Sequence, residues 1–320
     1  MRSEPISVVG RLAPSPTGAQ HVGNARTYLI AWLSARSAGG RVVLRIEDVD
    51  SPRIKTGAAA QACDDLRWLG LDWDGEPLVQ TQRLALYETA LDKLREQELV
   101  YPCTCSRADV ERAASAPHLD HEGPVYPGLC AHRRAADAAT LGDQSYCWRF
   151  RVPATSPAFV DGFLGPTTFD LRTLGGDFVV WKAPRGDIGA TPAYQLAVVV
   201  DDAAQGVTEV VRGDDLVPST PRQLLLYAAL GLTLPRFVHV PLVVGTDGRR
   251  LAKRHGDTRL ATLREASVTA ENLLGLLAWS CGWLERVRPV TMRELLSRFR
   301  LDTIPRGPFV LTPELLREIE

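Results

Sequence analysis

Apolar runs along the chain predict β-strands, and apolar residues at helical spacing between them predict α-helices. In the first part of the chain the two kinds of element alternate. The predicted elements are strands at 6–9 and 41–46, a helix that begins near residue 24, and helices at 58–69 and 83–98. The last of these helices carries one apolar stripe, formed by Leu84, Tyr87, Leu91 and Leu94. This order is typical of a parallel sheet covered by helices.

From Cys103 to about residue 191 the chain is rich in Pro, Gly, Cys and His, which we interpret as an insertion domain. It contains short predicted strands at 147–152 and 178–182. The sheet is then expected to resume with strands at 193–201, 207–211 and 238–244 and a helix at 220–229. A basic loop and helices at 270–281 and 292–298 follow.

The pattern therefore predicts a doubly wound α/β fold of the Rossmann type, interrupted by an insertion and followed by a small helical region. The predicted parts are 1–100 and 192–245 for the two halves of the catalytic domain, 101–191 for the insertion, and 246–320 for the basic loop and the C-terminal helices.

The amino-acid composition agrees with the predicted α/β fold. With 320 residues, 45% of them hydrophobic and 23% charged, the chain has the make-up of a globular enzyme of about two domains. A formal net charge of −1 gives no global signal for nucleic acid, so a nucleic-acid surface would have to be local. No signal peptide and no apolar run of ~20 residues is visible. We expect a cytoplasmic protein with reduced cysteines that binds neither membranes nor DNA.

Residues 11–24 carry the densest cluster of functional signals in the chain. A predicted strand leads into a loop rich in Pro and Gly, and the first predicted helix begins near Asn24. This arrangement brings a phosphate group against the amides of a helix N-terminus, and His21 and Asn24 add polar side chains there. The motif His-x-Gly-Asn is short, and a capped turn between a strand and a helix is the alternative interpretation.

Two blocks of the chain resemble the signatures of class I aminoacyl-tRNA synthetases. His21-Val-Gly-Asn24 resembles their HIGH-type motif, and the preceding Pro14-Ser-Pro-Thr-Gly18 resembles the glutamyl and glutaminyl branch in particular. Gly248-Arg-Arg-Leu-Ala-Lys-Arg254 resembles the KMSKS-type loop that follows the second half of the fold. The loop departs from the pattern, since Arg250 replaces the first lysine and Ala252 replaces the serine.

The resemblance implies that ATP, with Mg²⁺, activates L-glutamate in the Rossmann-type domain. The residues implied to bind ATP are Gly18, His21, Gly23, Asn24 and Lys253, with His21, Asn24 and Lys253 catalytic. Those implied to bind glutamate are Arg11, Ala13, Ser15, Glu47, Tyr194 and Arg212. Because glutamate has two carboxylates and one ammonium group, Glu47 is assigned to the ammonium and the two arginines and Tyr194 to the side-chain carboxylate.

Cysteines in the insertion predict one structural Zn²⁺ site. Cys103-Thr-Cys105 and Cys130 supply three thiolate ligands, while a set of buried free thiols is the alternative. By resemblance the fourth ligand is either His132, as in full-length bacterial glutamyl enzymes, or Tyr126, as in their short paralogues. We choose Tyr126. The remaining cysteines are interpreted as structural residues: Cys63, Cys147 and Cys281.

The resemblance covers nearly the whole chain but not the helical anticodon-binding region with which full glutamyl enzymes continue. The chain ends at Glu320, which favours a short paralogue that transfers glutamate to the queuosine base of tRNA(Asp). The expected partners are ATP, L-glutamate and queuosine-containing tRNA(Asp). Two alternatives are a minimal or truncated enzyme that charges tRNA(Glu), and a non-catalytic paralogue that binds glutamate or tRNA.

Overall fold

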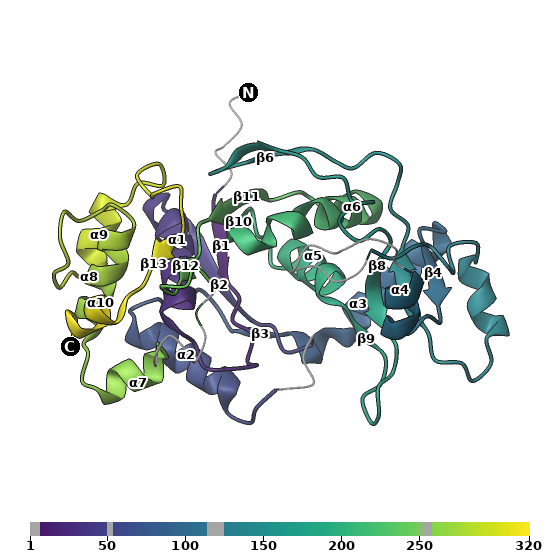
Figure 1. Ribbon diagram of the computed structural model, residues 1–320, viewed down its shortest axis with the longest axis horizontal. Helices are drawn as coiled ribbons and strands as arrows, with labels where there is room; N and C mark the ends of the chain where they lie inside the picture. The colour runs from purple at the N-terminus through teal and green to yellow at the C-terminus, as the bar shows by residue number, and fades with distance from the viewer. Residues whose placement is uncertain (1–6, 50–53, 114–124, 250, 252–257) are drawn as a thin grey trace.

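A parallel sheet at the centre of the molecule combines strands from both halves of the chain. The computed structural model describes residues 7–49, 54–113, 125–249, 251 and 258–320 (Figure 1). Its first elements are β1 (Val9–Leu12), α1 (Val22–Ser37), β2 (Arg41–Ile46), α2 (Ala58–Trp68), β3 (Leu78–Val79) and α3 (Leu84–Glu96). Strands β1, β2 and β3 pair in parallel. The predicted alternation is confirmed, although the first strand begins at Val9 and residue 6 lies outside the described residues.

Strands β10 (Glu209–Gly213) and β11 (Arg236–Val240) extend this sheet on the other side of β1. They are parallel to each other and are connected by the 3-10 helix η3 (Asp214–Ser219) and α6 (Thr220–Leu230). The amide of Thr208 donates to the carbonyl of Val9 at 2.9 Å, which places β10 beside β1. The ladders are β1-β2-β3 and β10-β11, and with β10 beside β1 the strands lie in the order 3-2-1-10-11. The chain continues from β1 to β2 on one side and from β10 to β11 on the other side.

Side chains of this sheet alternate between two hydrophobic clusters, one on each face. Leu44, Val211 and Val238 pack in the cluster that contains α1 and the C-terminal helices. Their neighbours Val210 and Phe237 pack in the cluster that contains α3, α5 and α6. A sheet covered on both faces requires apolar residues at nearly every strand position, which explains why its strands are apolar runs rather than alternating patterns.

The segment 193–201 is a helix, and its prediction as a strand is wrong. Helix α5 (Tyr194–Ala204) begins after an extended residue at Ala193, and it contacts α3, α6 and a strand of the insertion. Because it is covered from several sides, Leu196, Val198 and Val199 are all fully buried. A short run that is apolar all round does not distinguish a buried strand from a buried helix, and its consecutive valines favoured a strand.

The insertion forms an antiparallel sheet of its own. It contains β4 (Val100–Cys103), α4 (Arg107–Ala113), the 3-10 helix η2 (Ala135–Thr140), β5 (Cys147–Phe150), β6 (Phe159–Asp161), β7 (Gly165–Thr167), β8 (Phe178–Lys182) and β9 (Thr191–Pro192). The sheet order is 4-5-8-9, while β6 and β7 form a separate hairpin. That hairpin reaches the central sheet, where the amide of Gly162 donates to the carbonyl of Phe237 at 2.8 Å.

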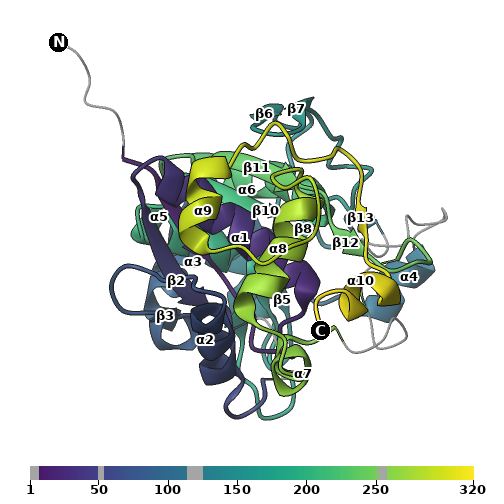
Figure 2. The same cartoon turned by 90° about the vertical axis from the view of Figure 1, so that its left-hand side faces the viewer.

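The C-terminal elements pack against α1. They are β12 (Val243–Val244), α7 (Leu260–Glu265), α8 (Ala270–Ser280), α9 (Met292–Arg298), β13 (Phe309–Val310) and α10 (Pro313–Arg317). The predicted strand at 238–244 is divided into β11 and β12, with Pro241, which has no amide donor, between them. Helices α8 and α9 lie alongside α1 (Figure 2), and Leu273 and Leu277 share its core cluster.

The insertion and the C-terminal helices lie at opposite ends of the longest axis of the molecule, with the central sheet between them (Figure 1). Of the helices in the described part of the chain, none combines the length and the apolar character that a membrane span requires.

Candidate active site

The imidazole of His21 caps the first residues of α1. Nδ1 of His21 accepts hydrogen bonds from the amides of Gly23 and Asn24 at 3.1 and 3.4 Å, and Oδ1 of Asn24 accepts from the amide of His21 at 3.3 Å. Because Nδ1 acts as an acceptor, the neutral ring carries its proton on Nε2. This end of the helix therefore combines an N–H donor with the positive end of the helix dipole.

A cavity of about 250 Å³ lies where β1, β2 and β10 end and α1 begins. Most of the residues predicted to bind substrates line it together, although they come from distant parts of the chain. They are Arg11, Ala13, His21, Gly23, Asn24, Glu47, Tyr194 and Arg212. The cavity thus occupies the carboxyl edge of the sheet at its switch point, where open α/β sheets bind ligands.

Some predicted residues are not part of this lining. Ser15 and Gly18 are exposed and do not line the cavity. Lys253 and Ala252 lie outside the described residues. Leu251 lines the cavity, and the carbonyl of Thr258 accepts from the amide of Val22 at 3.0 Å. Leu251 within the basic loop and Thr258 after it are therefore close to the cavity and to the start of α1.

Sequence reasoning missed about half of the lining. The additional residues are Thr27, Tyr28, Val211, Gly213, Asp215, Leu216, Leu242, Val243 and Leu251. Thr27 and Tyr28 follow Asn24 by three and four positions, so helical spacing alone could have placed them on the same face of α1. No comparable local signal exists for Leu242 and Val243, which reach the cavity only through the arrangement of β11 and β12.

Two arginines bring positive charge to the cavity. Nη1 of Arg11 donates to the carbonyl of Val211 at 2.7 Å, so the end of β1 is tied to β10. Arg212 lies opposite on β10, and its Nη1 is 3.5 Å from the hydroxyl of Tyr194. Both guanidinium groups are buried, so their charges are screened by little water.

Glu47 supplies a negative charge to the same cavity. Nη2 of the fully buried Arg45 donates to Oε1 of Glu47 at 3.0 Å, and Nη1 of Arg45 donates to Oδ1 of Asp202 at 2.7 Å. Burial raises the pKa of Glu47, while Arg45 and Arg11 act in the opposite direction. The cavity therefore holds two cations at its wall and one carboxylate, which matches the charges of an amino acid with an acidic side chain.

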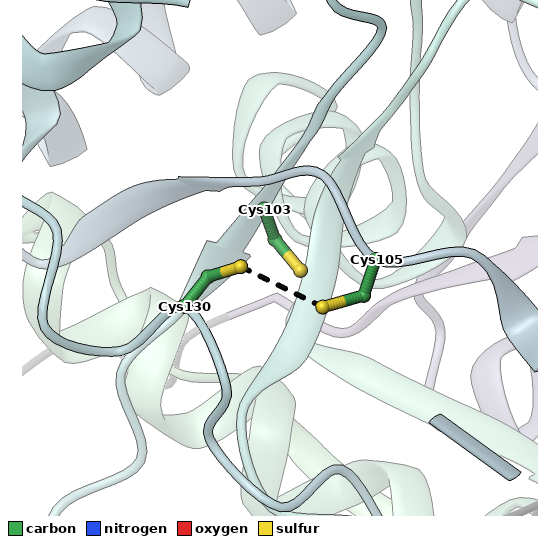
Figure 3. Close-up of side chains that lie close together, drawn as sticks. All are labelled: Cys103, Cys105 and Cys130. Atoms are coloured by element: carbon green, nitrogen blue, oxygen red, sulfur yellow. Dashed lines mark hydrogen bonds between the residues drawn. The ribbon is translucent and has the colours of Figure 1, made fainter. Parts of the chain in front are cut away.

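Three cysteines of the insertion form a compact cluster (Figure 3). The sulfur atoms of Cys103, Cys105 and Cys130 all lie within 4.8 Å of one another, and those of Cys105 and Cys130 are 3.6 Å apart. The three side chains point toward one another: Cys103 ends β4, Cys105 lies on the loop that follows, and Cys130 comes from a later segment. The spacing suits a tetrahedral ion with thiolate ligands, which the residue types also favour.

The phenol of Tyr126 completes this cluster. Its Oη lies 3.3 Å from Sγ of Cys103 and accepts from the amide of Cys130 at 2.8 Å. The guanidinium of Arg149 lies 3.8 Å from the centre of the Tyr126 ring and donates to Sγ of Cys103 at 3.4 Å. These donors stabilise anionic ligands, whereas His132 is exposed. The three cysteines could therefore hold a metal ion, and the hydroxyl of Tyr126 lies beside them.

The sheet order, the interrupting insertion and the capped His21 motif beside the cavity are those of a class I aminoacyl-tRNA synthetase catalytic domain. The family described as tRNA synthetases class I (E and Q), catalytic domain, matches residues 7–300. The chain belongs to this family.

Similar curated proteins narrow the comparison within the family. The chain is 50% identical over 319 residues to a glutamyl-Q tRNA(Asp) synthetase of Rhodopirellula baltica. The aligned region covers 95% of this chain and 97% of that protein. The corresponding protein of Symbiobacterium thermophilum is 50% identical, with 96% and 97% covered. A glutamate–tRNA ligase of Oleidesulfovibrio alaskensis is 40% identical over 97% of this chain but over only 65% of its own length.

A solved structure confirms the fold at lower sequence identity. The glutamate tRNA ligase of Elizabethkingia meningosepticum, crystallised in complex with its amino acid, superposes with a TM-score of 0.81 at 25% identity. The match covers 97% of this chain and 68% of that chain.

Proposed function

We propose that this protein activates L-glutamate with ATP and transfers it to the queuosine base of tRNA(Asp). The observation that carries the proposal is the cavity, in which Arg11, Arg212 and Glu47 meet with charges complementary to those of glutamate. In the first step a carboxylate oxygen of glutamate attacks the α-phosphorus of ATP, so that glutamyl-adenylate forms and pyrophosphate leaves. The second step transfers the glutamyl group to the RNA and releases AMP.

The glutamate end of the cavity is assigned by charge. Glu47 binds the α-ammonium group, and Arg11, Arg212 and Tyr194 bind the side-chain carboxylate. The carboxylate that reacts is then left facing the His21 end. Two arginines at fixed positions recognise a carboxylate by charge-assisted hydrogen bonds, and an uncharged substrate would bring no anion to the positive charge of this buried site. Ala13 lines the same wall, while Ser15 is assigned a supporting place in the adjoining loop.

The ATP end of the cavity is assigned to the start of α1 and to the basic loop. His21, through Nε2, and Asn24 stabilise the phosphates, Gly23 lets them approach the helix, and Gly18 belongs to the loop before it. Lys253 supplies the cation that offsets the negative charge developing on the leaving pyrophosphate, with Mg²⁺ bound to the nucleotide. The positions of Leu251 and Thr258 beside this end of the cavity support the assignment of the loop.

The insertion is assigned to RNA contact and is held together by zinc. A bound Zn²⁺ would cross-link β4 to the segment around Cys130 and so stabilise a part of the insertion with few hydrophobic residues. Cys103, Cys105 and Cys130 supply thiolates, and Tyr126 supplies the fourth ligand. In this proposal 1–100 and 192–245 form the catalytic unit, 101–191 the insertion, and 246–320 the loop and helices that complete the active site.

The choice of tRNA(Asp) rests on the relatives that match over nearly their whole length. The relatives of Rhodopirellula baltica and Symbiobacterium thermophilum, which are named glutamyl-Q tRNA(Asp) synthetase, match this chain over 97% of their own length, whereas the glutamate–tRNA ligase relative matches over 65% of its length.

The deciding experiment offers labelled glutamate, ATP and Mg²⁺ with three RNAs in separate reactions. They are tRNA(Glu), tRNA(Asp) with queuosine, and tRNA(Asp) without it. The proposal predicts label on the queuosine-containing RNA alone. Label on tRNA(Glu) would show a minimal glutamyl-tRNA synthetase instead. Absence of label and of ATP–pyrophosphate exchange with every RNA would show a non-catalytic paralogue.

A further inference from the structure

A buried histidine–aspartate pair lies behind Arg212, outside the lining of the cavity. Nδ1 of His239 and Oδ2 of Asp161 are 2.6 Å apart, and both side chains are fully buried. His239 belongs to β11 of the central sheet, whereas Asp161 ends β6 in the hairpin of the insertion. Gly162 permits this close approach, because a Cβ there would lie 2.8 Å from a methyl group of Val238.

The hydrogen bonds of Asp161 determine which nitrogen of His239 carries the proton. Oδ1 of Asp161 accepts from the amides of Phe163 and Leu164, both at 2.9 Å, and from the amide of His239 at 3.2 Å. Oδ2 is left to accept from Nδ1 of His239. Burial lowers the pKa of His239, so its ring is neutral near pH 7. With the proton on Nδ1, Nε2 is an acceptor.

Arg212 donates to that acceptor. Its Nε lies 2.9 Å from Nε2 of His239, and its Nη2 donates to Oγ1 of Thr220 at 2.9 Å and to the carbonyl of Leu216 at 3.4 Å. Protein acceptors therefore occupy the Nε and Nη2 donors. Nη1 makes only a long contact of 3.5 Å with the hydroxyl of Tyr194, and its second N–H is the part of the guanidinium that can donate to a ligand in the cavity.

We propose that Asp161 and His239 are positioning residues for glutamate. Asp161 fixes the tautomer of His239, and His239 fixes the orientation in which Arg212 presents Nη1 to the side-chain carboxylate. The inference rests on the proposed function, and it adds that a hairpin of the insertion takes part in amino-acid recognition. A guanidinium held by several acceptors loses little conformational freedom when the substrate binds, which strengthens binding.

The replacement Asp161→Asn tests this link with almost no change of shape. The three amides that surround Oδ1 require an oxygen there, so the new NH2 group takes the place of Oδ2 and faces Nδ1 of His239. The proton of His239 then moves to Nε2, where it opposes the N–H of Arg212. We expect the KM for glutamate in ATP–pyrophosphate exchange to rise about 10-fold or more, while the KM for ATP stays within about twofold.

Two replacements of His239 form a matched pair. In His239→Gln the amide oxygen can take the place of Nε2 and accept from Nε of Arg212. In His239→Asn the amide nitrogen replaces Nδ1, and Nε of Arg212 loses its acceptor. Both remove the same ring. We therefore expect the KM for glutamate to rise much more in His239→Asn than in His239→Gln. If Asp161→Asn does not fold, this pair of variants tests the positioning role by itself.

The outcomes separate the inference from the function on which it rests. The assays contain the RNA that the wild-type protein labels, and the thermal midpoint Tm of each variant is measured. An unchanged KM for glutamate in folded Asp161→Asn, equal KM values in the two His239 variants, or a parallel rise in the KM for ATP would overturn the inference. Wild-type protein without glutamate-dependent exchange would instead overturn the proposed function.

Discussion

Arg45 belongs to β2 and Glu47 follows the last residue of that strand, and the side chain of Arg45 donates to Oε1 of Glu47 from Nε at 3.2 Å and from Nη2 at 3.0 Å. Both donors of Arg45 meet the same carboxylate oxygen, so this charge-assisted contact holds Glu47 beside the end of the strand. Arg45 also donates to Asp202 on α5, so a helix on one face of the sheet helps to orient a carboxylate at its edge.

This contact predicts a large effect of Glu47→Gln on glutamate binding. The amide has the size of the carboxylate but no charge, so the α-ammonium group loses its counterion in a buried site. We expect the KM for glutamate to rise about 10- to 100-fold, with little change in the KM for ATP, when ATP–pyrophosphate exchange is measured. Glu76→Gln is the control, because Glu76 is exposed and does not line the cavity. An equal response of both variants would contradict the assignment.

Lys253 is predicted to act on the reaction rather than on the binding of glutamate. Lys253→Ala removes the cation assigned to the leaving pyrophosphate, and we expect exchange to fall about 100-fold or more. Glutamate binding, measured by calorimetry, should remain within about twofold, since the two ends of the cavity bind different substrates. Arg249→Ala, a change of an exposed cation in the same loop, should have a much smaller effect. Exchange at the wild-type rate in Lys253→Ala would show that another group supplies this charge.

Zinc binding is predicted to depend on Tyr126 and not on His132. Tyr126→Phe removes only the phenol oxygen and keeps the ring on which Arg149 lies, whereas His132→Ala changes an exposed side chain. Metal analysis of the purified proteins should find about one zinc per chain in the wild type and in His132→Ala, and less in Tyr126→Phe. Chelation should lower the Tm of the wild type. If His132→Ala loses its zinc and Tyr126→Phe keeps it, the ligand assignment is wrong.

Packing of the C-terminal helices makes a prediction for stability. Helix propensity alone would favour Gly275→Ala by about 1 kcal/mol. In this fold, however, a Cβ at Gly275 would lie 1.9 Å from the carbonyl oxygen of Arg288, so the chain there must shift. We expect a net loss of about 1–3 kcal/mol in the free energy of unfolding, measured by urea denaturation. Gly307→Ala is the control, because a Cβ there has no neighbour within 4 Å. Equal stabilities of the two variants would contradict this account.

Local sequence patterns were sufficient to predict helices that have one face in the core and the other in water. The helix predicted at 292–298 has these bounds in the structure. Of the stripe predicted on α3, Tyr87, Leu91 and Leu94 are buried, whereas Leu84, the first residue of the helix, is exposed. An amphipathic pattern carries this information because one face meets the core and the other meets water. Helix α5 carried no such contrast, since neighbouring elements cover several of its sides, and only its surroundings distinguish it from a strand.

In the candidate site, too, some features follow from the sequence and others depend on how distant elements pack. Strand ends and motif resemblance were enough to predict that Arg11, Glu47 and Arg212 share a cavity, because parallel strands bring their carboxyl ends to one edge. Tyr194 was predicted only by resemblance, and it reaches the cavity from the first residue of α5 rather than from a strand. Nothing in the spacing along the chain predicts that Asp161 of the insertion lies behind Arg212 through His239. That contact depends on how a hairpin packs onto β11, and such packing is set by the shapes of many side chains at once rather than by any local pattern.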